Sequence, residues 1–252
     1  MGKIVDITGA ADVSLAGQRV LIACAMMEDE VACAVEHAQE DVLTLWVDRG
    51  FHSEPDKLRR ELQRNVDWVE ERGATRILLA FGLCGNGAVG IVAKSAQLAI
   101  PRFDHCVNIM LECGPRTCQG RAQGGVMYLT RGWTHDAAAA MYSLKDQYVA
   151  KYGERRAKRL MEAMYGGYHA VSLIDNGCYE LVDVMDVAQR SADSINVGVQ
   201  IDPGSNQVLE KLISGPWDDD IVVCEPGRPL AQEDFFFDCE MRGNCSKQVL
   251  GY

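Results

Sequence analysis

Short apolar runs alternate with amphipathic segments along this chain, and this alternation constrains its fold more than any other feature. Runs of strand length lie at residues 19–25, 42–48, 76–81 and 99–103, and helical spacing follows the first two. Strands that alternate with helices favour right-handed crossovers and parallel pairing. We therefore predict an α/β fold built from parallel sheets with flanking helices.

The second half of the chain repeats this pattern. Apolar runs at residues 169–175, 195–200 and 220–224 each meet a turn, and residues 135–165 have helical character. We predict a duplicated βαβαβ unit, with two similar halves that face a cleft. The expected organisation is an N-terminal extension (1–18), a first half (19–134), a second half (135–230) and a tail (231–252).

Composition excludes several classes of function. The 252 residues carry a net charge of −11, which argues against nucleic acid and anionic membranes as partners. No apolar run reaches the roughly 20 residues that span a bilayer, and no signal-peptide pattern is present. We therefore expect a cytoplasmic protein. Its ten cysteines then indicate metal binding, catalysis or burial rather than disulfides.

Five cysteines and histidines come at or just after the ends of predicted strands: Cys24, His52, Cys84, His105 and Cys106. Ligands bind at the carboxyl edge of open α/β sheets, where neighbouring strands lie about 4.8 Å apart. We predict that Cys24, Cys84 and Cys106, with His52, hold zinc or an iron–sulfur cluster. The sequence contains no Cys-x-x-Cys pair, which is the usual linear signature of a metal site. The alternative is therefore that these cysteines are buried core residues beside functionally unrelated histidines.

Three residues are candidates for proton transfer at this site. His52 and His105 are each a further ligand or an acid–base group, and Asp104 is a harder ligand or a partner for a histidine. A zinc-bound thiol stays deprotonated at neutral pH, so a zinc thiolate is a plausible methyl acceptor.

The glycine-rich segment 85–90 supports a competing hypothesis. Its G-x-G-x-x-G pattern follows a predicted strand and is expected to open a helix, with Asp104 closing the next strand, as in a dinucleotide site. The alternative is that the glycines only form a tight turn. The candidate cofactor-binding residues are Gly82, Gly85, Asn86, Gly87 and Trp133, the last as an aromatic wall.

The remaining cysteines and histidines carry weaker signals. Cys33 is expected in the core, while Cys178 and Cys224 occupy strand-end turns that could face the cleft. Cys113 and Cys118 in a loop, and Cys239 and Cys245 in the tail, either join the site, form redox pairs or are exposed. The histidines expected to be structural are His37, His135 and His169.

Several short motifs together resemble a known family. They are Ile22-Ala23-Cys24, Gly50-Phe51-His52, Gly82-Leu83-Cys84-Gly85-Asn86-Gly87, Ile100-Pro101-Arg102, Gly132-Trp133, Leu209-Glu210-Lys211-Leu212 and Trp217-Asp218. With these motifs the chain resembles the domain-of-unknown-function family 1638 of anaerobic bacteria and methanogenic archaea. Its members often lie near genes for corrinoid-dependent methyl transfer, so the resemblance implies a setting in anaerobic one-carbon metabolism.

The chain departs from this family at two positions. The usual order after the Pro-Arg strand is His-Asp-Cys, whereas this chain has Asp104-His105-Cys106, so either residue can be the one that faces the site. Ala25 replaces the acid that usually follows the first cysteine.

Three functions are compatible with these features. The first is a metal-dependent transferase acting on a small molecule in methyl transfer or demethylation. The second is a nucleotide-dependent oxidoreductase that uses the glycine-rich loop. The third is a non-catalytic module that delivers a corrinoid or a metal to a methyltransferase or corrinoid protein. Acidic α/β proteins of this size also often form homodimers.

Overall fold

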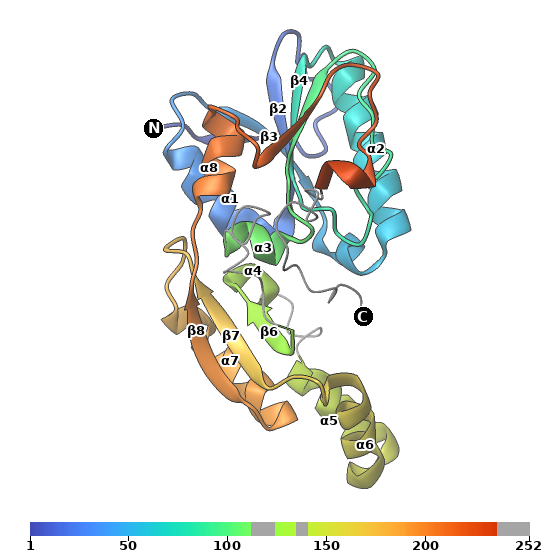
Figure 1. Ribbon diagram of the computed structural model, residues 1–252, viewed down its shortest axis with the longest axis vertical. Helices are drawn as coiled ribbons and strands as arrows, with labels where there is room; N and C mark the ends of the chain where they lie inside the picture. The colour runs from blue at the N-terminus through green and yellow to red at the C-terminus, as the bar shows by residue number, and fades with distance from the viewer. Residues whose placement is uncertain (112–123, 135–140, 236–252) are drawn as a thin grey trace, which may run out of the picture.

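The computed structural model describes residues 1–111, 124–134 and 141–235. Two β-sheets stand one above the other, as Figure 1 shows, with helices around each of them. The carboxyl ends of the upper strands point toward α3 and α4, which lie between the two sheets in this view. The predicted α/β class with parallel sheets and flanking helices is confirmed.

The larger sheet has six strands in the order β1-β3-β2-β4-β5-β9. The first five are parallel, and β9 is antiparallel to its neighbour β5. Their bounds are β1 Ile4–Asp6, β2 Arg19–Cys24, β3 Val42–Val47, β4 Arg76–Ala80, β5 Gln97–Pro101 and β9 Ile221–Cys224.

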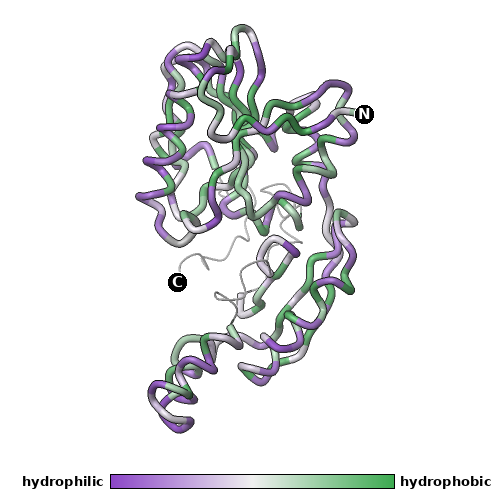
Figure 2. Tube along the Cα trace, turned by 180° about the vertical axis from the view of Figure 1, so that it is seen from behind, coloured by the Kyte–Doolittle hydropathy of each residue, from purple (hydrophilic) through white to green (hydrophobic). Residues whose placement is uncertain are grey.

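Helices cover both faces of this sheet, which explains why its central strands are apolar throughout. From Val20 to Cys24 every side chain of β2 is buried. Figure 1 shows α1 and α8 on one face and α2 on the other. Figure 2 shows hydrophobic residues concentrated along the strands between these layers. The bounds are α1 Glu28–Glu36, α2 Pro55–Glu71 and α8 Gln207–Ser214, with short helices η1 Ala25–Met27, η2 Arg49–Ser53, α3 Cys106–Met110 and η3 Gln232–Phe235.

The smaller sheet has three parallel strands in the order β6-β7-β8. Apolar side chains of β7 and α7 form a second hydrophobic cluster beside the main core. Among the elements of this part, α5 packs on α6 and α7. The bounds are β6 Val126–Leu129, α4 Arg131–Thr134, α5 Met141–Tyr152, α6 Glu154–Tyr165, β7 Ala170–Asp175, α7 Val182–Ile195 and β8 Gly198–Pro203.

The strands do not divide between the sheets as two equal units would. β6 precedes residue 134 but belongs to the smaller sheet, and β9 returns to the larger one. The expected extension contributes β1, which lies at the sheet edge beside β3. The strand β9, which was expected to be the third strand of a second unit, is therefore an edge strand of the larger sheet.

Two predicted boundaries are wrong for local reasons. The helical stretch expected at 135–165 is interrupted after α5, because Gly153 adopts a left-handed conformation with φ of +73°. The strand expected at 195–200 starts later, since α7 extends to Ile195 and Asn196 caps it with φ of +62°. Residues 135–140 lie outside the described residues.

Polar contacts join the larger sheet's helices to the smaller sheet. The guanidinium of Arg131 on α4 donates from Nε to the carboxylate of Asp29 on α1 at 2.8 Å. Beside this pair, Asn176 donates to Glu30 at 2.9 Å. Trp133 packs against both hydrophobic clusters. The two parts are therefore fastened at the carboxyl edge of the larger sheet.

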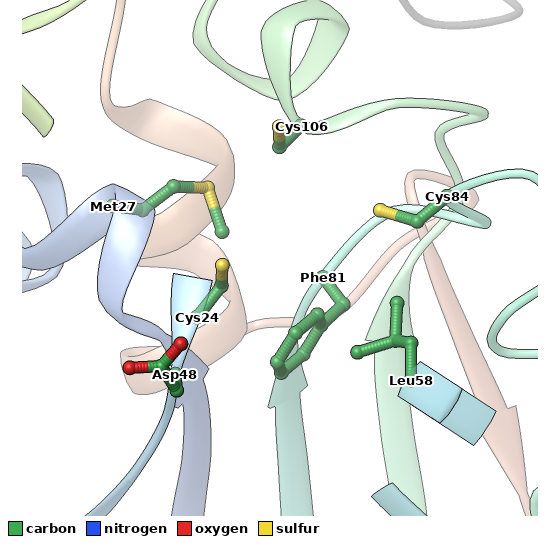
Figure 3. Close-up of a pocket in the computed structure, with 7 residues that line it drawn as sticks. All are labelled: Cys24, Met27, Asp48, Leu58, Phe81, Cys84 and Cys106. Carbon is green, nitrogen blue, oxygen red and sulfur yellow. The ribbon is translucent and has the colours of Figure 1, made fainter. Parts of the chain in front are cut away.

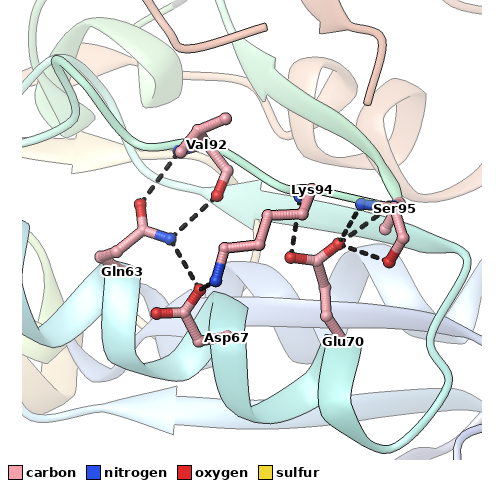
Figure 4. A network of polar contacts seen from close by, with 7 residues as sticks. Gln63, Asp67, Glu70, Val92, Lys94 and Ser95 are labelled. Carbon is pink, nitrogen blue, oxygen red and sulfur yellow. Dashed lines mark hydrogen bonds and ion pairs between the residues drawn. The ribbon is translucent and has the colours of Figure 1, made fainter. Parts of the chain in front are cut away.

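A polar network anchors the segment before β5 to α2 (Figure 4). The carboxylate of Glu70 accepts the backbone N–H groups of Lys94, Ser95 and Ala96 at 2.7–2.9 Å. The amide of Gln63 bonds both backbone groups of Val92. These contacts satisfy the backbone groups of an irregular segment that leads back along α2 to the start of β5.

Within the described residues, no helix is both long and apolar enough to cross a lipid bilayer.

Candidate functional site

Three thiols face one cavity at the carboxyl edge of the larger sheet. Cys24 ends β2, Cys84 lies in the turn after β4, and Cys106 begins α3 after β5. Since β2, β4 and β5 are consecutive neighbours in the sheet, their ends bring the three sulfurs together. Figure 3 shows the three cysteines on three sides of the cavity that they line.

The cavity is small and its walls are mostly apolar. The space available to the centre of a water-sized sphere is about 10 Å³, which corresponds to one water molecule or one ion. Besides the thiols, its walls are formed by Met27, Asp48, Leu58 and Phe81. A large organic cofactor has no room in this conformation.

Burial keeps the three thiols protonated. It raises the pKa of Cys24 to about 11 and that of Cys84 to about 12, and it raises the pKa of Cys106 well above 9. The pKa of Cys84 is also raised by the charge of Cys24, and the pKa of Cys106 by the charges of Cys84 and Cys24. The three groups are therefore electrostatically coupled. Only a cation in the cavity would favour three thiolates together.

Cys84 is held in an unusual backbone conformation. Its φ of +47° lies in the left-handed region, which costs a residue with a side chain on the order of 1 kcal/mol. The neighbouring Gly85, with φ of +63°, shows that the turn needs this conformation repeatedly. Glycine would adopt this conformation with less strain, so backbone preference does not explain why position 84 holds a cysteine.

Gly82 allows the turn to approach the segment that carries Cys106. A Cβ atom at Gly82 would lie 2.9–3.0 Å from backbone atoms of His105. The backbone N–H of Leu83 donates to Phe103 at 2.8 Å, and that of Cys84 donates to Asp104 at 2.9 Å. These contacts align the end of β4 with the start of α3.

His105 stands beside the cavity. Its Nδ1 atom accepts the backbone N–H of Val107 at 3.3 Å and lies 3.7 Å from the Sγ atom of Cys106. Burial lowers the pKa of His105, while the charge of Asp104 acts to raise it. Because burial disfavours the charged form of both groups, the imidazole can take the proton of Cys106 only if a cation in the cavity first stabilises the thiolate.

The other two candidate acid–base residues are placed differently. Asp104 is exposed, and its carboxylate accepts a hydrogen bond from Asn108 at 2.5 Å, so it does not line the cavity. The backbone of His52 lies in η2, directly after β3, but its side chain lies outside the described residues. Its predicted role as a ligand therefore stays a prediction.

The thiols are not arranged as a finished metal site. Among the side chains that the structure describes, no group of three or more Cys, His, Asp or Glu residues has the arrangement of metal ligands. The three sulfurs share a cavity, but a bound ion would have to draw them closer. The side chain of His52 lies outside the described residues, so a fourth ligand from η2 stays a prediction.

The glycine-rich segment does not open a helix, so that expectation is wrong. In the described chain, β4 is followed by turns and then by β5. The backbone N–H groups of Gly87, Ala88 and Gly90 donate to carbonyl oxygens of this protein, at Cys84, Leu83 and Leu230. These groups are therefore not available to a pyrophosphate as they would be at a helix N-terminus.

The remaining residues predicted to bind a cofactor have packing roles. A Cβ atom at Gly85 would lie 3.1 Å from Pro55, and one at Gly87 would lie 2.8 Å from Leu58. Asn86, with φ of +71°, accepts a hydrogen bond on its carbonyl oxygen from Arg59. Trp133 lies between the two hydrophobic clusters and does not line the cavity.

The sequence reasoning missed two polarizable or charged groups at the cavity. Met27 follows Cys24 by three residues, and its thioether lines the cavity. Asp48 follows β3 directly and also accepts the backbone N–H of Gly50 at 2.7 Å. Both come just after strand ends, so the rule that identified the cysteines could have found them.

The other described cysteines lie outside this cavity. Cys33, expected in the core, is only partly buried, and the thiol of Cys178 donates to the backbone carbonyl of Asn176 at 3.6 Å. Cys224 is buried, and Arg228 donates to its sulfur at 2.7 Å. The remaining cysteines and one histidine lie outside the described residues: Cys113, Cys118, Cys239, Cys245 and His135.

Comparisons with known proteins give one match. No curated protein and no solved structure matches the chain. A family model described as a protein of unknown function, DUF1638, matches residues 46–213. This match covers more than half of the chain and includes Cys84, Cys106 and the segment around His52. The chain therefore belongs to the DUF1638 family, as its motifs had indicated.

Proposed function

We propose that this protein binds one thiophilic metal ion, zinc in preference to iron, between Cys24, Cys84 and Cys106. The main support for this proposal is that three cysteines from the ends of three adjacent strands line the same cavity. We further propose that the loaded site acts in methyl transfer or demethylation in anaerobic one-carbon metabolism, in the cytoplasm where thiols stay reduced.

Ordinary burial accounts poorly for this cluster. Core filling requires neither three thiols around one cavity nor a cysteine at the left-handed position 84. The cost of keeping Cys84 there is understandable if the sulfur is needed as a ligand. Thiolates are the ligands preferred by zinc and other soft or borderline cations.

The size of the cavity favours a single ion over a cluster. A space of about 10 Å³ suits one ion, whereas an iron–sulfur cluster carries several atoms and is held by four protein ligands. The set of three described thiols leaves one coordination position for His52, for Met27 or for a substrate. An open position is the usual difference between a catalytic and a structural zinc site.

The residues of the chain then have separate tasks. A bound zinc ion would supply one effect, the stabilisation of thiolates at neutral pH. His105 is positioned to accept the proton that Cys106 loses, because its Nδ1 atom lies 3.7 Å from Sγ. The apolar walls formed by Leu58 and Phe81 exclude water from the nucleophilic sulfur. A thiolate so protected is suited to receive a methyl group from an electrophilic donor.

Metal analysis of protein purified without oxygen tests the first part of this proposal. We expect about one zinc per chain in the wild type, and a loss of most of it in Cys24→Ser, Cys84→Ser and Cys106→Ser. Cys33→Ser serves as the matched control and should keep its zinc, because Cys33 does not line the cavity. Less than about 0.2 metal per chain with three fully reactive thiols would end the proposal.

The methyl-transfer part needs a separate measurement. Zinc-loaded protein is incubated with methylcobalamin under reducing conditions, and methylated cysteine is sought by mass spectrometry of the 82–106 region and of Cys24. Methylation confined to the zinc-loaded wild type supports catalysis. Binding of the corrinoid without methylation favours the delivery hypothesis, in which a methyltransferase or corrinoid protein is the partner.

The oxidoreductase hypothesis has less support from the structure. Its glycine-rich segment lacks the helix that would bind a pyrophosphate, and several of its N–H groups are already bonded. Retention of a nucleotide or flavin in a metal-free preparation would favour it over the zinc proposal.

A further inference from the structure

Two helices beside the smaller sheet carry positive charge on an otherwise acidic chain. Residues 141–165, which contain α5 and α6, hold six lysines and arginines and three acidic residues, so their net charge is +3. The rest of the chain has a net charge of −14. Figure 1 shows α5 and α6 at the end of the molecule farthest from the larger sheet. They therefore present a local field opposite in sign to that of the remaining surface.

The arginines of α6 are exposed and lack carboxylate partners. Arg155, Arg156 and Arg159 all face solvent. In the described part of the chain, none of the three forms an ion pair with a carboxylate, and the ion pair within α6 joins Lys158 to Glu162. Arg155 and Arg159 are four residues apart, so they are neighbours on the helix surface. This side of α6 therefore holds positive charge that the chain itself does not neutralise.

An aromatic side chain extends this surface. Tyr152, the last residue of α5, is 38% exposed. The guanidinium carbon of Arg156 lies 5.3 Å from the centre of its ring, which is a cation–π distance. Tyrosine and arginine are enriched among the residues that anchor protein–protein interfaces. We call Tyr152, Arg155, Arg156 and Arg159 the basic surface.

A complementary surface lies at the start of α7. Val182, Asp183 and Asp186 are exposed, and their spacing of three and four residues makes them neighbours on the helix. Val182 is 78% exposed. Within the described residues the ion pairs of the two aspartates are long, at 3.8 Å from Asp183 to Arg131 and 3.9 Å from Asp186 to Arg190. We call Val182, Asp183 and Asp186 the acidic surface.

We propose that these surfaces form an interface between two copies of this chain, in which the basic surface of one copy contacts the acidic surface of the other. In a two-fold dimer this contact forms twice, so both surfaces of both copies are used. Tyr152 and Val182 supply apolar contact area, and the opposite charges fix the orientation.

The distribution of exposed apolar side chains supports a protein as the occupant. Six large apolar side chains are exposed in the described part of the chain, and four of them lie on α5, α6, α7 and β8: Tyr152, Met164, Val182 and Ile201. Such clustering is typical of protein–protein contacts. A nucleic acid fits less well, because the net charge of −11 and the nearby acidic surface repel phosphates.

Sedimentation equilibrium of the full chain tests this interface. At about 50 μM protein and about 50 mM salt, where surface charges are less strongly screened, we expect twice the 27.7 kDa mass of one chain. Arg155→Glu with Arg159→Glu places like charges across the interface and should weaken dimerisation by roughly tenfold or more. Asp183→Lys with Asp186→Lys should have the same effect. Circular dichroism checks that both variants are folded.

Mixing the two charge-reversed variants is the sharper measurement. In the mixture, the glutamates introduced on α6 of one variant meet the lysines introduced on α7 of the other, while the second contact keeps its native residues. We therefore expect a mixed dimer with near wild-type affinity. The control, Arg60→Glu with Arg64→Glu, reverses an exposed pair of the same spacing on α2 and should dimerise like the wild type.

Three results would overturn this inference. The first is a wild type that stays monomeric under these conditions. The second is a dimer that neither reversal weakens, or a mixture that does not restore the dimer. The third is a monomer that binds single-stranded RNA through Arg155 and Arg159, which would assign the basic surface to nucleic acid. None of these results bears on zinc binding, because neither surface lines the candidate metal cavity.

Discussion

The Nδ1 atom of His105 lies 3.7 Å from the Sγ atom of the adjacent Cys106. The same nitrogen accepts the backbone N–H of Val107, so the side chain of His105 caps α3. A nitrogen that accepts two contacts is unprotonated, which places the single proton of the neutral ring on Nε2. The fold therefore keeps a neutral imidazole next to a neutral thiol.

This pairing predicts a loss of stability in mild acid. Burial lowers the pKa of His105 below 6.5, so the unfolded chain binds a proton that the folded chain resists. The stabilisation is present above pH 6.5 and is lost as the pH falls. In metal-free protein we expect lower stability at pH 5.5 than at pH 7.5 from this residue.

Urea unfolding at pH 7.5 and 5.5 checks this expectation. His105→Asn is the matched variant, because asparagine also caps helices but does not titrate. The variant should lose less stability than the wild type between the two pH values. Equal losses in both proteins would show that the imidazole is not responsible.

The buried thiols predict the opposite trend in alkali. Their pKa values are raised by burial to about 11 for Cys24 and about 12 for Cys84, whereas the unfolded chain ionises them near 9. Above pH 9 the folded state therefore holds more protons, and stability falls as the pH rises. For each such thiol the slope approaches about 1.4 kcal/mol per pH unit once the unfolded chain is fully ionised.

The free energy of unfolding between pH 9 and 10.5 measures this slope. We expect Cys106→Ser, which removes one buried thiol, to show a shallower decline than the wild type. Parallel declines in the two proteins would mean that Cys106 ionises equally in the folded and the unfolded state. Water would then reach the thiol in the folded protein.

Much of the larger sheet was predictable from the sequence, because its central strands are apolar on both faces. The run at 19–25 became β2, and the run at 76–81 became β4, each within one residue of the expected end. The sheet that residues 221–224 join could not be predicted from the sequence. A short apolar run does not specify which sheet it joins, and β9 is placed beside β5 by long-range packing.

The site was partly predictable for a related reason. Residues after strand ends converge when the strands are neighbours, and this rule placed Cys24 and Cys84 correctly at one cavity. The rule also applies to Asp48, which was overlooked because one carboxylate after a strand is common. The role of Gly82 depends on an approach to His105, and no local pattern contains that contact.

A change at Gly82 should disturb both the fold and the site. In Gly82→Ala the new Cβ atom would meet the backbone of His105 at 2.9–3.0 Å, and a backbone cannot move as a side chain does. We expect a loss of about 2 kcal/mol in stability and weaker zinc binding. Gly167→Ala is the control, since nothing lies within 4 Å of its Cβ position.

The network on α2 predicts a stability effect far from the cavity. Although burial acts to raise the pKa of Glu70, hydrogen bonds from Lys94, Ser95 and Ala96 lower it. Glu70→Gln should cost about 1–2 kcal/mol at pH 7, because an amide cannot accept all these bonds. The exposed neighbour variant Glu71→Gln should cost less.

The pH dependence of that cost gives a sharper check. A carboxylate with a lowered pKa stabilises the fold above the unfolded value of about 4.5, and its contribution is lost as the pH falls. The difference between wild type and Glu70→Gln in urea unfolding should therefore be smaller at pH 4 than at pH 7. A difference that stays constant would assign the effect to shape rather than charge.

Zinc binding itself should release protons in a predictable number. Cys24, Cys84 and Cys106 are all protonated at pH 7, and each must lose its proton to become a ligand. We expect about three protons per zinc ion, less any fraction retained by His105. Calorimetry in two buffers with different ionisation enthalpies measures this number directly. Cys106→Ser should release about one proton fewer, and release of fewer than about one by the wild type would contradict binding through three thiolates.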